Sequence, residues 1–194
     1  MKLIDLESPE EPLQYIEGTE WDRVTQDYIR QYKGILTDAE CKKIIDANEH
    51  DEWDDEWDEN PWIVGTYDDN RVCDVKSIKD PEIDDILFGA FGRMLKLYAR
   101  DFWRASLCLT DTGYTLFKYS LGDSNPIHIE PSGSTIIATL ILSSSEGGGM
   151  QFFNKEKVDA SIGTGIIYPS SFMFPSAVLP VTEGVRYYVS TTFK

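Results

Sequence analysis

One apolar run stands out in the sequence: Thr135-Ile136-Ile137-Ala138-Thr139-Leu140-Ile141-Leu142. In a strand with only one buried face, apolar and polar side chains alternate, whereas here nearly every position is apolar. The run therefore predicts a central β-strand that is buried on both faces. We expect the rest of the fold to be built around it.

From about Ala105 onward the sequence is rich in Val, Ile, Thr, Tyr and Phe and is punctuated by Gly, Pro and Ser. Turns are predicted at four glycine-containing sites: Asp111-Thr112-Gly113, Gly147-Gly148-Gly149, Gly163-Thr164-Gly165 and Glu183-Gly184. Many short strands at this spacing indicate a barrel or a sandwich. The last predicted strand, Val185 to Phe193, would place Arg186, Tyr188 and Ser190 on one face.

Two helices are predicted before this region, and both have clear start signals. Thr37-Asp38-Ala39-Glu40 is a capping box, in which the threonine hydroxyl and the glutamate carboxylate satisfy free backbone N–H groups. The apolar face of the helix that follows consists of Cys41, Ile44, Ile45 and Ala47. A second helix begins at Asp80-Pro81, with the aspartate as N-cap and the proline in the first turn. Its apolar residues recur at helical spacing and predict a helix lying flat on the sheet: Ile83, Ile86, Leu87, Ala90, Phe91, Met94 and Tyr98.

These elements predict an α+β protein with a single domain over residues 1–194. With 194 residues and 41% hydrophobic content, the chain is long enough for one real core and too short for two comfortable ones. We expect residues from about 1 to 104 to form a helical support with an acidic insertion. Residues from about 105 to 194 would form the β-sheet core.

The formal net charge of −16 argues against two classes of partner. Phosphate backbones and anionic lipid would be repelled, so we expect no nucleic-acid and no membrane partner, although a small anion could enter a locally positive pocket. No run approaches the roughly 18 apolar residues of a membrane span, and no export signal is visible at the start. The cysteines Cys41, Cys73 and Cys108 fit no metal-binding spacing, which indicates a reducing cytoplasm, or the host cytoplasm for a viral protein.

An acidic stretch that contains three tryptophans separates the two helices: Asp51-Glu52-Trp53-Asp54-Asp55-Glu56-Trp57-Asp58-Glu59-Asn60-Pro61-Trp62. Its charge density opposes compact packing, yet the indoles are unusual for a solvated tail. One interpretation is an exposed loop or helix end whose indoles dock on the body. The other is a lid that contacts a substrate or partner through aromatic anchors. Its carboxylates lack the glycine-containing pattern of a calcium loop.

The strongest candidate for a metal site is His128-Ile129-Glu130. On an extended strand, positions 128 and 130 point the same way, so an imidazole and a carboxylate can bind one ion together. A third protein ligand is needed, but the tail from Phe172 to Tyr187 contains no histidine. The only other histidine, His50, lies in the acidic helical region, where nothing brings it to the pocket.

The C-terminal half resembles the iron(II)- and 2-oxoglutarate-dependent oxygenases, specifically the prolyl 4-hydroxylase-like group common in phages and bacteria. The resemblance covers about residues 105–194, with a weaker match from Tyr32 to Ile45. Several segments follow the family's order. Tyr119 stands where the family has its pocket tyrosine, and His128-Ile129-Glu130 stands at its HxD motif. Gly147 to Phe152 resembles its GG-x-x-F turn and strand, Ile167 to Ser170 its next strand, and Pro180 to Tyr187 its PVxxGxRY ending.

This resemblance implies a double-stranded β-helix, or jelly roll, backed by N-terminal helices, with iron(II) and 2-oxoglutarate as the cofactors of an active protein. It implies that His128 and Glu130 are metal ligands, with Glu130 standing where the family has the shorter aspartate. The family's distal histidine aligns with Ser176, whose neutral hydroxyl is a poor substitute for imidazole in a facial triad. A serine here is compatible both with a native residue and with one introduced in place of a histidine.

The resemblance also implies roles for Arg186 and Tyr119 in binding 2-oxoglutarate. A basic residue at position 186 holds the distal carboxylate of this cosubstrate in the family, and the planar guanidinium of arginine can bind a carboxylate bidentately. The alternative for Arg186 is an ion pair with Glu183 or Glu130. The alternative for Tyr119 is a core phenol with one satisfied hydroxyl.

Two functions stay open at this point. The first is a dioxygenase-like protein of prolyl-hydroxylase type that depends on 2-oxoglutarate and iron(II), acts on a peptidyl or small-molecule substrate, and has impaired or lost its standard activity because of Ser176. The second is a non-catalytic jelly-roll module, derived from that family, that binds a protein partner or takes part in an assembly. Whether the chain is an enzyme is therefore undecided from the residues alone.

Overall fold

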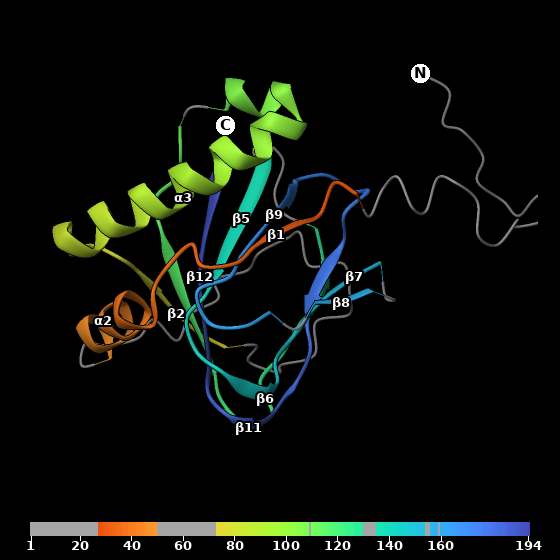
Figure 1. Ribbon diagram of the computed structural model, residues 1–194. Helices are drawn as coiled ribbons and strands as arrows, with labels where there is room; N and C mark the ends of the chain where they lie inside the picture. Colours follow the sequence, from red (N-terminus) through yellow and green to blue (C-terminus); the bar gives the residue numbers. More distant parts are fainter. Residues whose placement is uncertain (1–26, 50–72, 109, 130–134, 154–155, 159) are drawn as a thin grey trace, which may run out of the picture.

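A computed structural model describes residues 27–49, 73–108, 110–129, 135–153, 156–158 and 160–194 (Figure 1). The acidic tryptophan-containing stretch at residues 51–62, His50 and Glu130 lie outside the described residues.

The larger sheet has six strands among the described residues, in the order β1-β9-β5-β12-β3-β2, and all neighbours are antiparallel. The strands are β1 (Arg30–Tyr32), β2 (Asp74–Ser77), β3 (Thr115–Tyr119), β5 (Ile136–Ile141), β9 (Gly165–Pro169) and β12 (Arg186–Phe193). Strand β5 is buried at every position, which confirms the prediction of a central strand covered on both faces.

A second sheet faces the larger one and has the order β4-β10-β7-β8. Its strands are β4 (Asn125–His128), β7 (Met150–Phe152), β8 (Glu156–Val158) and β10 (Ser176–Val178). A short pair formed by β6 (Ser145–Gly147) and β11 (Val181–Gly184) closes one end. Two facing antiparallel sheets with these long-range connections form the predicted jelly roll.

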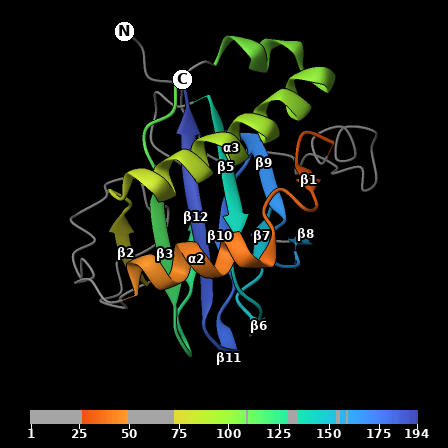
Figure 2. The same ribbon diagram turned by 60° about the vertical axis from the view of Figure 1, so that its left-hand side comes forward.

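Two α-helices, α2 (Asp38–Asn48) and α3 (Pro81–Asp101), cross the outer face of the larger sheet (Figure 2). The predicted capping box of α2 is present, with the Thr37 hydroxyl accepting from the Glu40 N–H at 3.2 Å. The carboxylate of Asp80 accepts from the N–H groups of Glu82 and Ile83 at 2.8 and 3.1 Å, so it caps α3 as expected. A short 3-10 helix, η1 (Trp103–Leu107), follows α3.

The larger sheet separates two apolar cores. Because successive side chains of a strand point to opposite faces, Ile136, Ala138 and Leu140 of β5 pack with the helices, whereas Ile137 and Ile141 pack between the two sheets. The inter-sheet core also contains Met150, Phe152 and Val178 of the smaller sheet. This second core is the interior of the jelly roll, where any internal site must lie.

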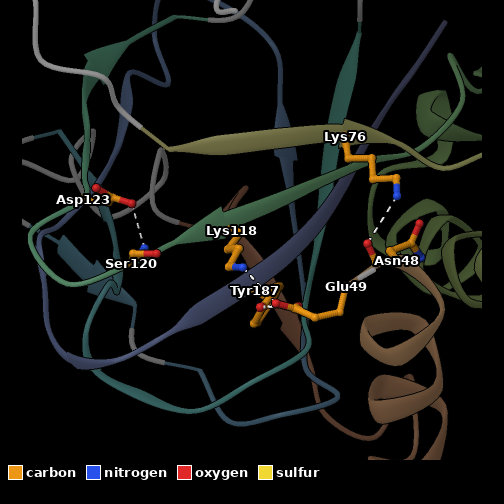
Figure 3. A network of polar contacts seen from close by, with 7 residues as sticks. All are labelled: Asn48, Glu49, Lys76, Lys118, Ser120, Asp123 and Tyr187. Atoms are coloured by element: carbon orange, nitrogen blue, oxygen red, sulfur yellow. Dashed lines mark hydrogen bonds and ion pairs between the residues drawn. The ribbon is translucent and has the colours of Figure 1, made fainter. Parts of the chain in front are cut away.

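The end of α2 is held on the sheet by polar contacts (Figure 3). The Glu49 carboxylate accepts a hydrogen bond from the Tyr187 hydroxyl and lies 2.8 Å from the Lys118 ammonium group. Lys76 donates to the Asn48 carbonyl at 3.2 Å. Cations near a helix C-terminus complement its partial negative charge, so these contacts fix α2 on strands β2, β3 and β12.

Two features differ from the sequence-based expectations. Residues before about 105 also supply the edge strands β1 and β2, in a region that was predicted to be helical and acidic. Ala47 is exposed, and the neighbouring Asn48 is buried instead, with its amide donating to the Ile44 carbonyl at 2.8 Å. The strands escaped prediction because they are short and are stabilised by pairing with β9 and β3, which lie far along the chain.

Candidate functional site

Two of the predicted site residues, Tyr119 and Arg186, are directly opposite each other in the pairing of β3 with β12. Opposed residues of an antiparallel pair lie on the same face of the sheet. Each is only 2% exposed, and this face lines the inter-sheet core. The larger sheet thus brings a phenol and a guanidinium side by side in the interior of the jelly roll.

Arg186 is held by backbone carbonyls and by an aromatic ring. Its Nη1 and Nη2 atoms donate to the carbonyl oxygens of Ser143 and Ala160 at 3.1 and 3.0 Å. The guanidinium carbon lies 5.3 Å from the ring centre of Tyr188, which is a favourable cation–π distance. The guanidinium is therefore fixed in one orientation. Glu183, one of the alternative partners considered for it, is exposed on β11.

The glycine turn predicted at residues 147–149 lies against the same arginine. Gly148 has a φ of +68°, and a Cβ atom at this position would lie 3.2 Å from the Cβ of Arg186 and 2.9 Å from Val181. Its carbonyl accepts a hydrogen bond from the Tyr188 hydroxyl. The absence of a side chain at Gly148 is what lets this turn pack on the stem of Arg186.

Tyr119 has the environment of a neutral phenol. Complete burial raises the pKa of its hydroxyl well above the ordinary value, and the neighbouring Cys73 thiol raises it further, while a hydrogen bond with Asn125 acts in the opposite direction. The Tyr119 ring also meets Tyr188 edge to face, with the centroids 5.7 Å apart. Tyr119 can therefore donate or accept a hydrogen bond in the interior but carries no charge near neutral pH.

His128 and Ser176 form the corresponding pair on the smaller sheet. They are directly opposite each other where β4 pairs with β10, and the register shifts just beyond them. His128 is half-buried, and its Nδ1 lies 2.9 Å from the Pro126 carbonyl oxygen. This contact fits a proton on Nδ1, which leaves Nε2 as the nitrogen with a lone pair.

Ser176 is buried, at 3% exposure, and its hydroxyl lies 3.4 Å from that of Tyr168. Tyr168 comes from β9 of the larger sheet, so this contact bridges the two sheets. The ring of Tyr168 packs edge to face on Phe152 with centroids 4.8 Å apart. Two neutral hydroxyl groups therefore occupy the interior next to His128.

This set of donors does not fit an iron site of two imidazoles and one carboxylate. Within the described ranges, no group of three His, Cys, Asp or Glu side chains lies close enough together to hold a metal ion. A hydroxyl binds divalent iron far less well than imidazole does, so His128 and Ser176 do not supply the two nitrogens that such a site requires.

Sequence reasoning gave no role to four residues that complete this region, namely Cys73, Asn125, Tyr168 and Tyr188. The alternation of β12 had already placed Tyr188 on the face of Arg186, so its contact was detectable. The contact of Cys73 with Tyr119 joins segments that are distant in sequence, and the contacts of Asn125 with Tyr119 and of Tyr168 with Ser176 join the two sheets. Only the strand pairing could reveal them.

The fold is that of the prolyl 4-hydroxylases, a double-stranded β-helix with helices on one side, as the structural comparisons show. The similar structures share 14–17% of residues with this chain, so the likeness is one of fold. No family model matches the sequence, and no curated protein is significantly similar to it.

Three solved structures illustrate the likeness. A viral collagen prolyl hydroxylase from Paramecium bursaria Chlorella virus 1, in complex with 2-oxoglutarate, is 17% identical with a TM-score of 0.64, covering 86% of this chain and 94% of the other. A Pseudomonas putida prolyl-4-hydroxylase is 16% identical with a TM-score of 0.66, covering 89% of this chain and 97% of the other. A Trichoplax adhaerens prolyl hydroxylase, in complex with a hypoxia-inducible-factor peptide fragment, is 14% identical with a TM-score of 0.68, covering 89% of this chain and 86% of the other.

Neither described helix combines the length and apolar character needed to cross a bilayer.

Proposed function

We propose that this chain is a dioxygenase-like protein of the prolyl-hydroxylase type that has lost the standard iron(II)- and 2-oxoglutarate-dependent hydroxylation and works as a binding or assembly module. The observation that carries the proposal is the pair formed by His128 and Ser176. The residue opposite His128 is a buried serine that faces another hydroxyl. The position at which the fold family supplies a second imidazole thus supplies a neutral oxygen.

The residues around Arg186 in the interior also support descent from an oxygenase. Arg186 and Tyr119 are opposed on the larger sheet, and the Gly148 turn packs against the arginine stem. A buried arginine with a fixed orientation is suited to a small carboxylate ligand such as 2-oxoglutarate. Retention of this pair together with an incomplete set of metal ligands is what a non-catalytic descendant would have.

A working oxygenase is the second candidate, and the same Arg186 and Tyr119 pair favours it. For this function the missing ligand would have to come from a group other than Ser176. Glu130, which would supply the carboxylate, lies outside the described residues. The substrate in this case would be a peptidyl prolyl group or a small molecule with a similar C–H bond.

An anaerobic titration with iron(II) and 2-oxoglutarate separates the two candidates. We expect no visible charge-transfer band in the unaltered chain, because two protein ligands at most are available. Ser176→His should produce the band, since it restores the second imidazole opposite His128. A band in the unaltered chain, together with turnover of 2-oxoglutarate in the presence of ascorbate, would contradict the proposal.

Two variants control for effects of an added histidine. Ser106→His adds an imidazole on the exposed face of η1 and should give no band. The double variant Ser176→His with His128→Gln removes the native imidazole opposite the restored one and should lose the band again. A band in either control would mean that the metal binds elsewhere.

A further inference from the structure

A group of aromatic and arginine side chains lies at the C-terminal end of α3, away from the pairs described above. Trp103 and Leu107 of η1 are 66% and 68% exposed, and Tyr28 is 39% exposed. The Tyr28 ring stacks on Phe102 with centroids 4.7 Å apart. Large apolar side chains exposed together are uncommon on a soluble surface, and tryptophan and tyrosine are the residues most enriched at the centres of protein interfaces.

Two arginines lie over two of these aromatic rings. The guanidinium of Arg30 lies 5.4 Å from the Phe102 ring centre, and that of Arg104 lies 5.2 Å from the Trp103 ring centre. An arginine stacked on a ring keeps its N–H edge available to a carboxylate. We call this group, consisting of Tyr28, Arg30, Phe102, Trp103, Arg104 and Leu107, the arginine–aromatic patch.

Within the described ranges, two aspartates, Asp27 and Asp101, lie near the patch. Asp101 lies 3.6 Å from the Arg30 guanidinium, and the exposed Asp27 precedes Tyr28. The exposed Arg100 precedes Asp101 at the end of α3, and with Arg30 it lowers the pKa of Tyr32, which burial raises. In the whole chain, 34 acidic residues outnumber 18 basic ones. Among the residues that the structure describes at the patch, the arginines outnumber the aspartates, so their summed charge has the opposite sign to the net charge.

We propose that the arginine–aromatic patch is a docking surface for an acidic peptide segment of another protein, with an apolar or aromatic side chain as its anchor. Carboxylates of the peptide would bind Arg104 and Arg100, and the anchor would pack on Trp103 and Leu107. The proposal follows from charge complementarity and from the residue types exposed. It does not depend on whether the jelly-roll interior binds iron.

Two other occupants fit the observations less well. A nucleic acid carries negative charge along its full length and would be repelled by the rest of a chain with a net charge of −16. A second copy of this chain carries the same net charge, which opposes self-association at low salt. A short peptide needs to match only the patch itself.

The test uses fluorescence anisotropy with the full chain and a short fluorescein-labelled peptide of glutamates around a central Leu-Phe pair. Two comparison peptides replace the glutamates by lysine or the Leu-Phe pair by serine, and an oligothymidine single strand is the nucleic-acid probe. We expect the glutamate and Leu-Phe peptide to bind best. Added salt should weaken it, because exposed charge pairs are screened.

Trp103→Ala and Arg104→Glu should each weaken binding of this peptide by about tenfold, as expected for residues at the centre of an interface. The matched controls are Leu121→Ala, which removes another exposed apolar side chain, and Lys42→Glu, which makes the same charge change on α2. Neither control should change the affinity by more than about twofold, since a change of this size corresponds to well under 1 kcal/mol.

Four results of the binding and self-association measurements would overturn the proposal. These are equal binding of the lysine peptide, unchanged affinity in both patch variants, preferred binding of oligothymidine, and self-association that Arg104→Glu abolishes. Protection of residues 1–26 from protease that Arg104→Glu removes would also overturn it, since the occupant would then be the chain's own N-terminal segment.

Discussion

At the scale of single residues, the interior depends on a few positions where an added atom has no room. Gly148 is one example, because its turn has a positive φ and packs directly on Arg186 and Val181. The sequence predicted the turn from its three successive glycines. It did not predict which glycine meets the arginine, because that contact joins β12 to a turn about forty residues earlier in the chain.

Gly148→Ala should destabilise the protein more than Gly34→Ala does. The φ angles are +68° and +67°, so the backbone penalty of about 1–2 kcal/mol is common to both substitutions. Only at Gly148 would the new Cβ meet neighbours, at 2.9–3.3 Å, whereas nothing lies within 4 Å at Gly34. We expect an additional loss of about 1–3 kcal/mol from overpacking, measured by urea denaturation. Equal losses would mean that the turn moves away at no cost.

The same scale sets the limit on predicting the site. His128, Ser176, Tyr119 and Arg186 were expected at the site from the family resemblance, and the strand pairing places them in two opposed pairs. The hydroxyl of Tyr168 beside Ser176 could not be anticipated, since it crosses from one sheet to the other. A ligand position is defined by two sheets at once, whereas a sequence pattern describes one strand at a time.

At the scale of elements, the helices were the most predictable parts because their signals are local. The capping box at Thr37 and the N-cap at Asp80 are both present, and the apolar stripe of α3 is buried on the sheet. Strands β1 and β2 were missed, since three or four residues carry little periodic information and their stability comes from distant partners.

Asp80→Ala should lower the free energy of unfolding by about 1 kcal/mol, because the N–H groups of Glu82 and Ile83 would lose their acceptor. Asp80→Asn keeps an acceptor oxygen at the same place and should cost clearly less. Urea denaturation of both variants would measure the difference. Identical losses would show that the charge of Asp80, and not its hydrogen bonds, is what stabilises the start of α3.

At the scale of the whole molecule, buried tyrosine hydroxyls and a buried cysteine thiol make the stability of the fold sensitive to alkaline pH. Burial is the main cause that raises the pKa of the tyrosines Tyr98, Tyr114, Tyr119 and Tyr187, and it raises the pKa of the Cys41 thiol to about 11. Carboxylates contribute for two of these phenols, through Asp111 beside Tyr114 and Glu49 beside Tyr187. All of these groups are neutral in the folded protein at physiological pH.

Stability should therefore fall steeply above about pH 9–10. Each group ionises more easily in the unfolded chain, where a cysteine has a pKa of about 8.5 and a tyrosine of about 10. The stability that these neutral groups contribute is fully present below the unfolded-state pKa values and is lost as the pH rises through the folded-state pKa values. Thermal denaturation across alkaline pH, with tyrosinate absorbance recorded in parallel, would measure this. Stability that stays constant into strong alkali would contradict the expectation.

A single variant checks the origin of the pH dependence. Tyr98→Phe removes one buried phenol, whose hydroxyl donates to the Tyr28 carbonyl at 2.9 Å. The loss of that hydrogen bond should lower stability at neutral pH, while the decline with rising pH becomes shallower. An unchanged slope would mean that Tyr98 ionises without unfolding.

The position of β12 in the larger sheet has a consequence for the way this protein is made. Strand β12 follows both β3 and β5 in chain order, yet it lies between them near the middle of the sheet. On the ribosome, β3 and β5 emerge earlier and must wait with unsatisfied edges until β12 arrives between them. Translation speed and early chaperone contact over this interval would thus govern the fraction of synthesised molecules that reaches the native state.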